Sequence, residues 1–365
     1  MHPNSLRALT ESTGPFVSVY FEDSHDTEDA RTRLELSWRG IEEELRERSA
    51  PDEAVEALRS AVLDAPPAVG RSGRALIAAG ATVLVDERLL GPPVRTEVRV
   101  SELPYLVPLV DHGPVDLTYL VAWVDHAGAD ITVHGPGGVH EETVDAVSGP
   151  VHQAAGAESA GYGTPQRRTD DAARRNVSAV ADRVTHLIDE RRLDVAFVAG
   201  EVRSRSDLRG ALPERTADVV VELDIGARGS GDHDEELARA IEEEVERRRL
   251  AAMDDAARRW SAETGRGSGL AIDGLDDVCA AVRDGSLETL LVGDLPEVTV
   301  VADSSPTMIA PDPDALSVFG VSPARTLRAD EAVPFGALHL DAEVLRVDER
   351  IDPRDGIAAL RRYAT

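Results

Sequence analysis

The sequence predicts an α/β protein made of three consecutive mixed α/β domains. Runs of β-branched and aromatic residues alternate along the chain with runs in which apolar residues recur every three or four positions. This alternation is typical of strands packed against helices. The chain has 365 residues and 42% hydrophobic content, enough for two or three domains with cores of their own. We place the domains at residues 1–113, 114–260 and 261–365.

The first domain combines strands with amphipathic helices. Its strand candidates are rich in β-branched and aromatic residues, and a Gly-Ala pair separates two of them in the manner of a hairpin. In chain order we expect a strand at 16–21, helices at 28–47 and 52–63, a hairpin joining 75–79 to 82–85, and a strand at 94–100.

The second domain contains a hairpin, a long loop and a helix followed by a buried strand. Asp125 to Gly128 has the chemistry of a hairpin turn, and a glycine ends the buried strand. In chain order we expect strands at 117–124 and 131–134, a loop at 148–168, a helix from Arg168 onward, strands at 194–200 and 219–223, and a charged helix at 232–260.

The third domain also combines predicted helices with predicted strands. The single cysteine of the chain, Cys279, lies in an apolar stretch with helical spacing, so it excludes an internal disulfide and is expected to fill the core. In chain order we expect a helix at 275–283 and strands at 289–292, 298–302 and 337–340.

Two groups of residues contain possible metal ligands, but we predict neither a metal nor a cofactor. Carboxylates before a helix stabilise its positive end, and three histidines without cysteine partners or helical i, i+4 spacing argue only weakly for zinc. The groups are Asp23, His25, Asp26 and Asp29 before the first long helix, and His134, His140 and His152 in the second domain.

The charge of the chain restricts its chemistry. All 39 residues counted as lysine or arginine are arginine, and 68 acidic residues bring the formal net charge to −29. Without lysine, a phosphate-binding loop and Schiff-base catalysis are excluded. Nonspecific adhesion to nucleic acid is disfavoured, and any specific contact with phosphate must be made by arginine.

The sequence predicts a cytoplasmic protein without a membrane segment. No apolar run approaches the ~20 residues that cross a bilayer. The opening residues, Met1 to Ser5, do not begin a signal peptide.

The loop at 148–168 ends in a glycine-rich and basic tip. Residues 148–160 show no apolar period, and the glycines and the proline of the tip disfavour both helix and strand. A loop of this length inside a compact chain is usually either functional or disordered. The tip consists of Gly161, Tyr162, Gly163, Thr164, Pro165, Gln166, Arg167 and Arg168.

The helix after the tip extends its positive charge. Arg167, Arg168, Arg174 and Arg175 outnumber two nearby aspartates, so the local charge is 4 − 2 = +2 in a chain of net charge −29. A basic tip on an acidic protein suits insertion into a polyanion better than packing against the protein itself.

Three stretches in the same order resemble the bacterial relatives of the archaeal and eukaryotic class-one release factors and of Pelota. The tip and the helix start after it look like the central-domain loop of that family. The resemblance runs along nearly the whole chain and is closest to the actinobacterial branch of Balon-like ribosome hibernation factors. The other two stretches are 265–293, which looks like the entry to the family's last domain, and 356–363, which is similar to the ending of Pelota-type chains.

The resemblance implies a ribosome-binding translation factor with the Pelota-like order of three α/β domains. In the family, the first domain faces the decoding centre. The central loop occupies the aminoacyl site and reaches the ribosomal RNA of the peptidyl-transferase centre. The last domain has a ribosomal-protein-like fold and contacts a translational GTPase such as elongation factor Tu. For the Balon-like branch, the resemblance implies hibernation of the ribosome in a stress response.

The tip departs from the pattern of the peptide-releasing members. In those proteins two glycines directly precede the glutamine, whereas here Thr164 and Pro165 stand between Gly163 and Gln166. We therefore expect binding without peptide release. The alternative is a peptidyl-tRNA hydrolase or release-factor-like activity that uses Gln166, since a related loop in the quality-control branch also separates glycine from glutamine. An unrelated α/β enzyme is the third interpretation, and it lacks a recognisable nucleophile, metal or phosphate motif.

Overall fold

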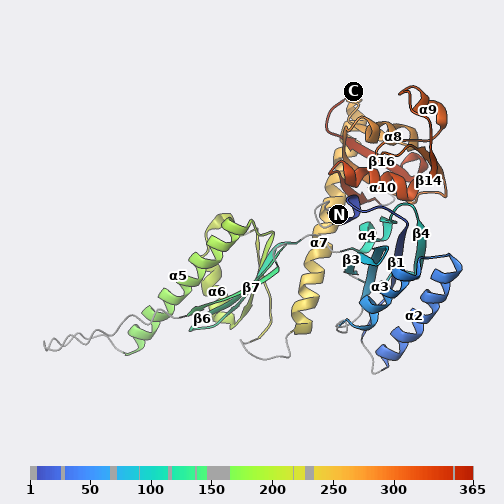
Figure 1. Ribbon diagram of the computed structural model, residues 1–365. Coiled ribbons are helices and arrows are strands. Elements are labelled where there is room, and N and C mark those ends of the chain that lie inside the picture. The colour runs from blue at the N-terminus through green and yellow to red at the C-terminus, as the bar shows by residue number, and fades with distance from the viewer. Residues whose placement is uncertain are drawn as a thin grey trace. The chain divides into compact units, whose positions relative to one another are not determined.

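The computed structural model describes residues 6–25, 29–65, 72–89, 91–113, 117–135, 138–145, 165–216, 218–226, 234–347 and 350–364 (Figure 1). Residues Met1–Val115 and Val245–Thr365 form one compact unit, the first unit, and Asp116–Glu244 form the second unit. In these described residues, four sheets and several helices form a mixed α/β fold, as predicted.

The N-terminal part of the first unit is an antiparallel sheet of order β3-β2-β1-β4. Alternate residues of β1 point to opposite faces, so Val17 and Val19 pack against two helices while Phe16 and Tyr20 face the other side. The elements are α1 (Arg7–Thr10), β1 (Phe16–Glu22), α2 (Ala30–Glu47), α3 (Asp52–Leu63), β2 (Gly73–Ala79), β3 (Thr82–Leu89), β4 (Glu97–Ser101) and α4 (Val107–His112).

The C-terminal part of the first unit holds two sheets, of order β10-β16-β11-β15 and β13-β12-β14. The elements are β10 (Ala271–Asp273), α8 (Leu275–Arg283), β11 (Leu287–Val292), β12 (Thr299–Ala302), β13 (Ile309–Ala310), α9 (Pro313–Ser317), β14 (Arg325–Arg328), α10 (Ala329–His339), β15 (Glu343–Arg346) and β16 (Ile357–Arg361).

One hydrophobic core joins the two parts of the first unit. Phe16 of β1 and Phe335 of α10 meet edge to face, with ring centroids 6.2 Å apart. Tyr20 lies in the same core, together with Cys279, which is buried as expected. The N-terminal and C-terminal segments of the chain therefore share apolar contacts, which neither could make alone.

The strand predicted at 337–340 is wrong. These residues end α10, a helix in which Ala329 to Leu338 are all buried. A helix that is buried all round shows no amphipathic period, so its short apolar runs cannot be told from a strand by pattern.

The second unit is a five-stranded sheet of order β7-β6-β5-β8-β9. Strands β5, β6 and β7 are antiparallel neighbours, whereas β5, β8 and β9 run parallel. The elements are β5 (Tyr119–Val124), β6 (Gly128–Gly135), β7 (Gly138–Asp145), α5 (Pro165–Arg191), β8 (Val195–Gly200), α6 (Val202–Ala211), β9 (Val220–Glu222) and α7 (Asp234–Arg266), whose later part belongs to the first unit.

Helices cover both faces of this sheet. Leu120, Ala122 and Val198 pack against residues of α5 and α6, while Val121 and Phe197 pack against the start of α7. The strands predicted at 117–124 and 194–200 are confirmed within two residues of their bounds, whereas β7 and α6 were not predicted. Apolar residues are few in β7 and α6, so the apolar period that would indicate these elements is weak.

Within the described part of the chain, no helix combines the length and the apolar character needed to cross a bilayer.

Candidate functional site

The helix α5 begins at Pro165, so Gln166, Arg167 and Arg168 belong to its first turn. The predicted loop at 148–168 was wrong at this end, because the helix already begins at Pro165. Proline is tolerated as the first residue of a helix because its nitrogen would have no partner there and its φ angle already fits. The remaining tip residues, Gly161, Tyr162, Gly163 and Thr164, lie outside the described residues.

The apolar face of α5 anchors the helix on the sheet. Val180, Val184 and Leu187 recur at helical spacing and are buried against strands of the second unit. Burial of three such side chains is worth about 1.5–3 kcal/mol each relative to exposure. This half of the helix is thus held by packing.

Asn176 is a polar anchor on the same face. Its side chain is 9% exposed, and its Nδ2 donates to the backbone carbonyl oxygen of His126 at 3.2 Å. His126 lies in the turn that follows β5, where the Asp125 carboxylate accepts from the backbone nitrogens of Ala127 and Gly128 at 2.7 and 2.9 Å. The helix is therefore bonded to a turn that has its own internal hydrogen bonds.

Arg183 makes a second polar contact between α5 and the sheet. Its Nε and Nη2 donate to the two carboxylate oxygens of Glu142 on β7, at 2.6 and 2.5 Å. The hydrogen bond from Arg183 lowers the pKa of Glu142 below its usual value. Such bidentate pairs fix the orientation of the two side chains as well as the distance between them.

Arg174 and Arg175 lie on the exposed surface of α5 and make no ion pair with any residue whose side chain the structure describes. The backbone N–H groups of the first turn of a helix also lack partners within the helix and favour anions. The N-terminal half of α5 therefore combines exposed arginines with a positive helix end. This combination suits phosphate.

The carboxyl ends of the parallel strands β5 and β8 meet beside this helix. Gly200 ends β8 with φ of 118°, and a Cβ atom there would lie 2.1 Å from the carbonyl oxygen of Val124. Only glycine allows this approach of the two strands. Glu201 follows, and its carboxylate lies 3.5 Å from Nδ1 of His126.

Sequence reasoning missed Asn176, Arg183, Glu142 and the backbone carbonyl of His126 as the groups that hold α5 on the sheet. A polar residue on the otherwise apolar face of a predicted helix was the available signal for Asn176. Nothing in the sequence indicated its partner, 50 positions away.

The metal candidates do not gather. Among the described residues, no three His, Cys, Asp or Glu side chains could hold a metal ion. Asp23 is buried beside Arg74 and His25, and burial raises its pKa. His134 stacks on Tyr119 with ring centroids 4.5 Å apart, and burial lowers its pKa. His140 is exposed and lies next to the carboxylate of Glu142. Asp26 and His152 lie outside the described residues.

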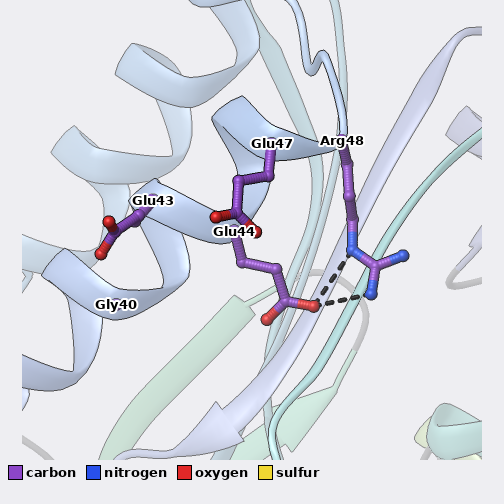
Figure 2. A pocket seen from close by; sticks show the side chains of 5 residues that line it. All are labelled: Gly40, Glu43, Glu44, Glu47 and Arg48. Carbon is purple, nitrogen blue, oxygen red and sulfur yellow. Dashed lines mark hydrogen bonds and ion pairs between the residues drawn. The ribbon is translucent and has the colours of Figure 1, made fainter.

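A surface hollow on α2 offers no comparable chemistry. It is lined by Gly40, Glu43, Glu44, Glu47 and Arg48, all from this helix and its C-terminal cap (Figure 2). The Arg48 guanidinium is already paired, since its Nε and Nη2 lie 3.0 and 2.7 Å from Oε1 of Glu44. Three carboxylates on one face repel a polyanion. They are typical of a helix surface that faces solvent.

These features define a mixed α/β protein whose central helix presents a basic N-terminal half beside a parallel-strand edge. Residues 118–266 match the family model described as bacterial archaeo-eukaryotic release factor family 2. The chain is 47% identical over 364 residues to two proteins of Mycobacterium tuberculosis, "Uncharacterized protein MT2704" and "Uncharacterized protein Rv2629". These matches cover 100% of this chain and 97% of each relative. The chain belongs to one family with these two mycobacterial proteins, and its residues 118–266 carry the match to bacterial archaeo-eukaryotic release factor family 2.

Solved structures of release-factor and Pelota type are similar at a more distant level. The archaeal translation termination factor aRF1 is 15% identical, with 100% and 99% coverage of the two chains and a TM-score of 0.28. Pelota of Archaeoglobus fulgidus is 16% identical, with 80% and 84% coverage and a TM-score of 0.38. A ribosome-bound archaeal Pelota is 15% identical, with 100% and 94% coverage and a TM-score of 0.41. The family description comes from the match of residues 118–266.

Proposed function

We propose that the protein is a ribosome-binding translation factor that occupies the aminoacyl site and holds the ribosome in hibernation without releasing peptide. The N-terminal end of α5, together with residues 161–164, would enter the peptidyl-transferase centre, and arginines would meet ribosomal RNA. A translational GTPase such as elongation factor Tu would be a further partner. The place of action would be the cytoplasm.

The observation that carries the proposal is the charge of α5. Arg174 and Arg175 are exposed and have no acidic partner among the described side chains, in a chain of net charge −29. Exposed cations on an acidic protein gain most from a polyanionic partner. Membership in a release-factor family supports ribosomal RNA as that partner.

The absence of peptide release is supported by the helix start. Pro165 begins α5, so the residue before Gln166 has no N–H group with which to stabilise a developing oxyanion. Gln166 then belongs to the first helical turn. Two directly adjacent glycines would leave the backbone free at this point, and here they are replaced by Thr164 and Pro165.

Co-sedimentation with ribosomes tests the binding. Wild-type protein is expected to pellet with intact ribosomes, and deletion of residues 161–168 is expected to leave it in the supernatant. A matched deletion in the first unit, residues 66–71, controls for the loss of a segment of similar length. Equal pelleting of wild type and the 161–168 deletion would contradict the proposal.

A peptidyl-tRNA hydrolase activity is the second candidate, favoured by the position of Gln166 at the helix start before Arg167 and Arg168. In this case Gln166 would order the attacking water. The test is release of labelled peptide from peptidyl-tRNA in purified ribosomes, comparing wild type with Gln166→Ala and with the control Gln153→Ala. Release by wild type that only Gln166→Ala abolishes would establish this activity. No release, or release unaffected by Gln166→Ala, would exclude it.

A further inference from the structure

Two polar contacts attach α5 to the sheet in addition to its apolar face. Asn176 bonds the backbone carbonyl of His126, and Arg183 pairs with Glu142 on β7. Asn176 and Arg183 are seven positions apart, about two helical turns, so both contacts lie on the face that meets the sheet.

Asn176 marks the point at which the described attachment begins. It is the most N-terminal buried side chain of α5 among those that the structure describes, and Arg174 and Arg175 just before it are exposed. The N-terminal turns of α5 reach past the sheet (Figure 1). Ten residues separate Asn176 from Gln166, a rise of about 15 Å along the helix axis.

The partner of Asn176 is part of a rigid turn. The backbone nitrogen of Asp125 donates to the carbonyl oxygen of Gly128 at 3.0 Å, and the Asp125 carboxylate accepts from Ala127 and Gly128. The carbonyl of His126 is therefore held in a fixed direction. A hydrogen bond to such an acceptor constrains the helix more than a bond to a freely moving loop would.

We infer that Asn176 is a positioning residue, whose bond to the His126 carbonyl sets the direction in which the first turns of α5 leave the sheet. A rotation of about 10° about this point displaces Gln166 by about 3 Å, because the lever is about 15 Å long. This inference rests on the proposed function, in which that end of α5 must enter a confined ribosomal site.

The orientation of α5 can be measured in the free full-length protein. Spin labels at Arg168→Cys and Ser206→Cys report the distance from the first turn of α5 to α6. Cys279 is buried, and burial raises the pKa of its thiol to about 12, so it reacts slowly with the label. Asn176→Asp keeps the size of the side chain and removes the donor. We expect its distance distribution to widen and its mean to move by about 3 Å.

His126→Ala is the matched control. His126 contributes only its backbone oxygen to the bond, so this variant keeps the acceptor and should keep the wild-type distribution. Asn176→Ala removes the donor without adding charge and should repeat the result of Asn176→Asp. An unchanged distribution in both Asn176 variants, even with a lowered melting temperature, would overturn the inference and leave Asn176 a purely structural role.

Ribosome affinity supplies the second readout. If the loosened helix adopts the competent direction about a tenth of the time, the apparent Kd rises about tenfold. Asn176→Asp should show this loss, and His126→Ala should bind like wild type. Equal affinities of all three proteins would overturn the inference, whereas a wild type that fails to bind ribosomes would overturn the proposed function. The spin-label distances separate the two failures because they are measured without ribosomes.

Discussion

Arg99 on β4 and Asp330 on α10 are 231 positions apart in the sequence, and Nη1 of Arg99 lies 2.9 Å from Oδ2 of Asp330. The same nitrogen lies 3.3 Å from Oε1 of Glu331, and the guanidinium carbon sits 3.6 Å from the ring centre of Tyr105. One arginine thus links the N-terminal and C-terminal segments of the first unit. Asp330 and Glu331 are both buried.

Removing this arginine should destabilise the protein. Arg99→Met is expected to lower the free energy of unfolding by about 3 kcal/mol, because the buried carboxylate of Glu331 loses its cation, while Asp330 remains paired with Arg328. Urea unfolding at neutral pH measures the loss. Arg31→Met removes an exposed i, i+4 pair with Glu35 and should change stability by less than about 0.5 kcal/mol. Similar losses in the two variants would contradict a special role for Arg99.

The pKa of Glu331 is raised, first by burial and next by the neighbouring Asp330. The folded state therefore holds this proton to higher pH than the unfolded state does, and stability falls as pH rises from about 4.5 through the folded pKa. Glu331→Gln removes this dependence. Relative to wild type, the variant should gain stability above pH 4.5 and reach a plateau above the folded pKa.

Urea titrations at a series of pH values measure this difference. Glu297→Gln, whose side chain is 88% exposed, is the control and should follow wild type at every pH. A stability difference for Glu331→Gln that shrinks with rising pH would have the wrong sign and refute the prediction.

The pair of Arg183 and Glu142 should make the stability of the fold depend on pH in the opposite sense to Glu331. The pKa of Glu142 is lowered by the hydrogen bond from Arg183, so the pair stabilises the fold above the unfolded pKa and loses this effect as pH falls through the folded pKa. Glu142→Gln should cost about 1 kcal/mol at pH 7, a discounted figure because Arg183 is partly exposed. Unfolding curves at pH 7 and at pH 3 test whether the cost disappears in acid, with Glu190→Gln as an exposed control.

The junction of β5 and β8 requires glycine. Gly200→Ala should destabilise the protein by on the order of 3 kcal/mol, because φ is 118° and the added carbon would lie 2.1 Å from the Val124 oxygen. Gly210→Ala, within α6 and with no atom near its would-be Cβ, should instead stabilise by about 0.5–1 kcal/mol. Thermal unfolding of the two variants should shift in opposite directions.

Because Arg174 and Arg175 of α5 are exposed, we predict that they contribute to the salt dependence of ribosome binding. If both contact ribosomal phosphate, Arg174→Gln with Arg175→Gln should weaken ribosome binding. The slope of log affinity against log salt concentration should fall by about 2. Filter binding across a salt series gives the slope. Arg258→Gln, an exposed arginine of α7, should leave it unchanged. A wild-type slope in the double variant would mean that neither arginine contacts RNA.

The local spacing of apolar residues and the turn residues predicted many elements of the fold. The helices expected at 52–63 and 275–283 have those bounds in the structure, because each repeats apolar residues at helical spacing and buries that face. The hairpin around Asp125 to Gly128 was likewise correct, since its turn chemistry is local. The run at 337–340 failed because a fully buried helix has no polar face to reveal its period.

The sequence by itself determined the α/β class, the acidic charge, the arginine-rich segment around Gln166 and the family resemblance. These depend on composition and on neighbours within a few positions. Only the tertiary structure decided that Asn176 meets the carbonyl of His126, and that Arg99 meets Asp330. Such pairs depend on how strands and helices pack. A contact between distant segments does not change the spacing of apolar residues along the chain, so the sequence pattern cannot reveal it.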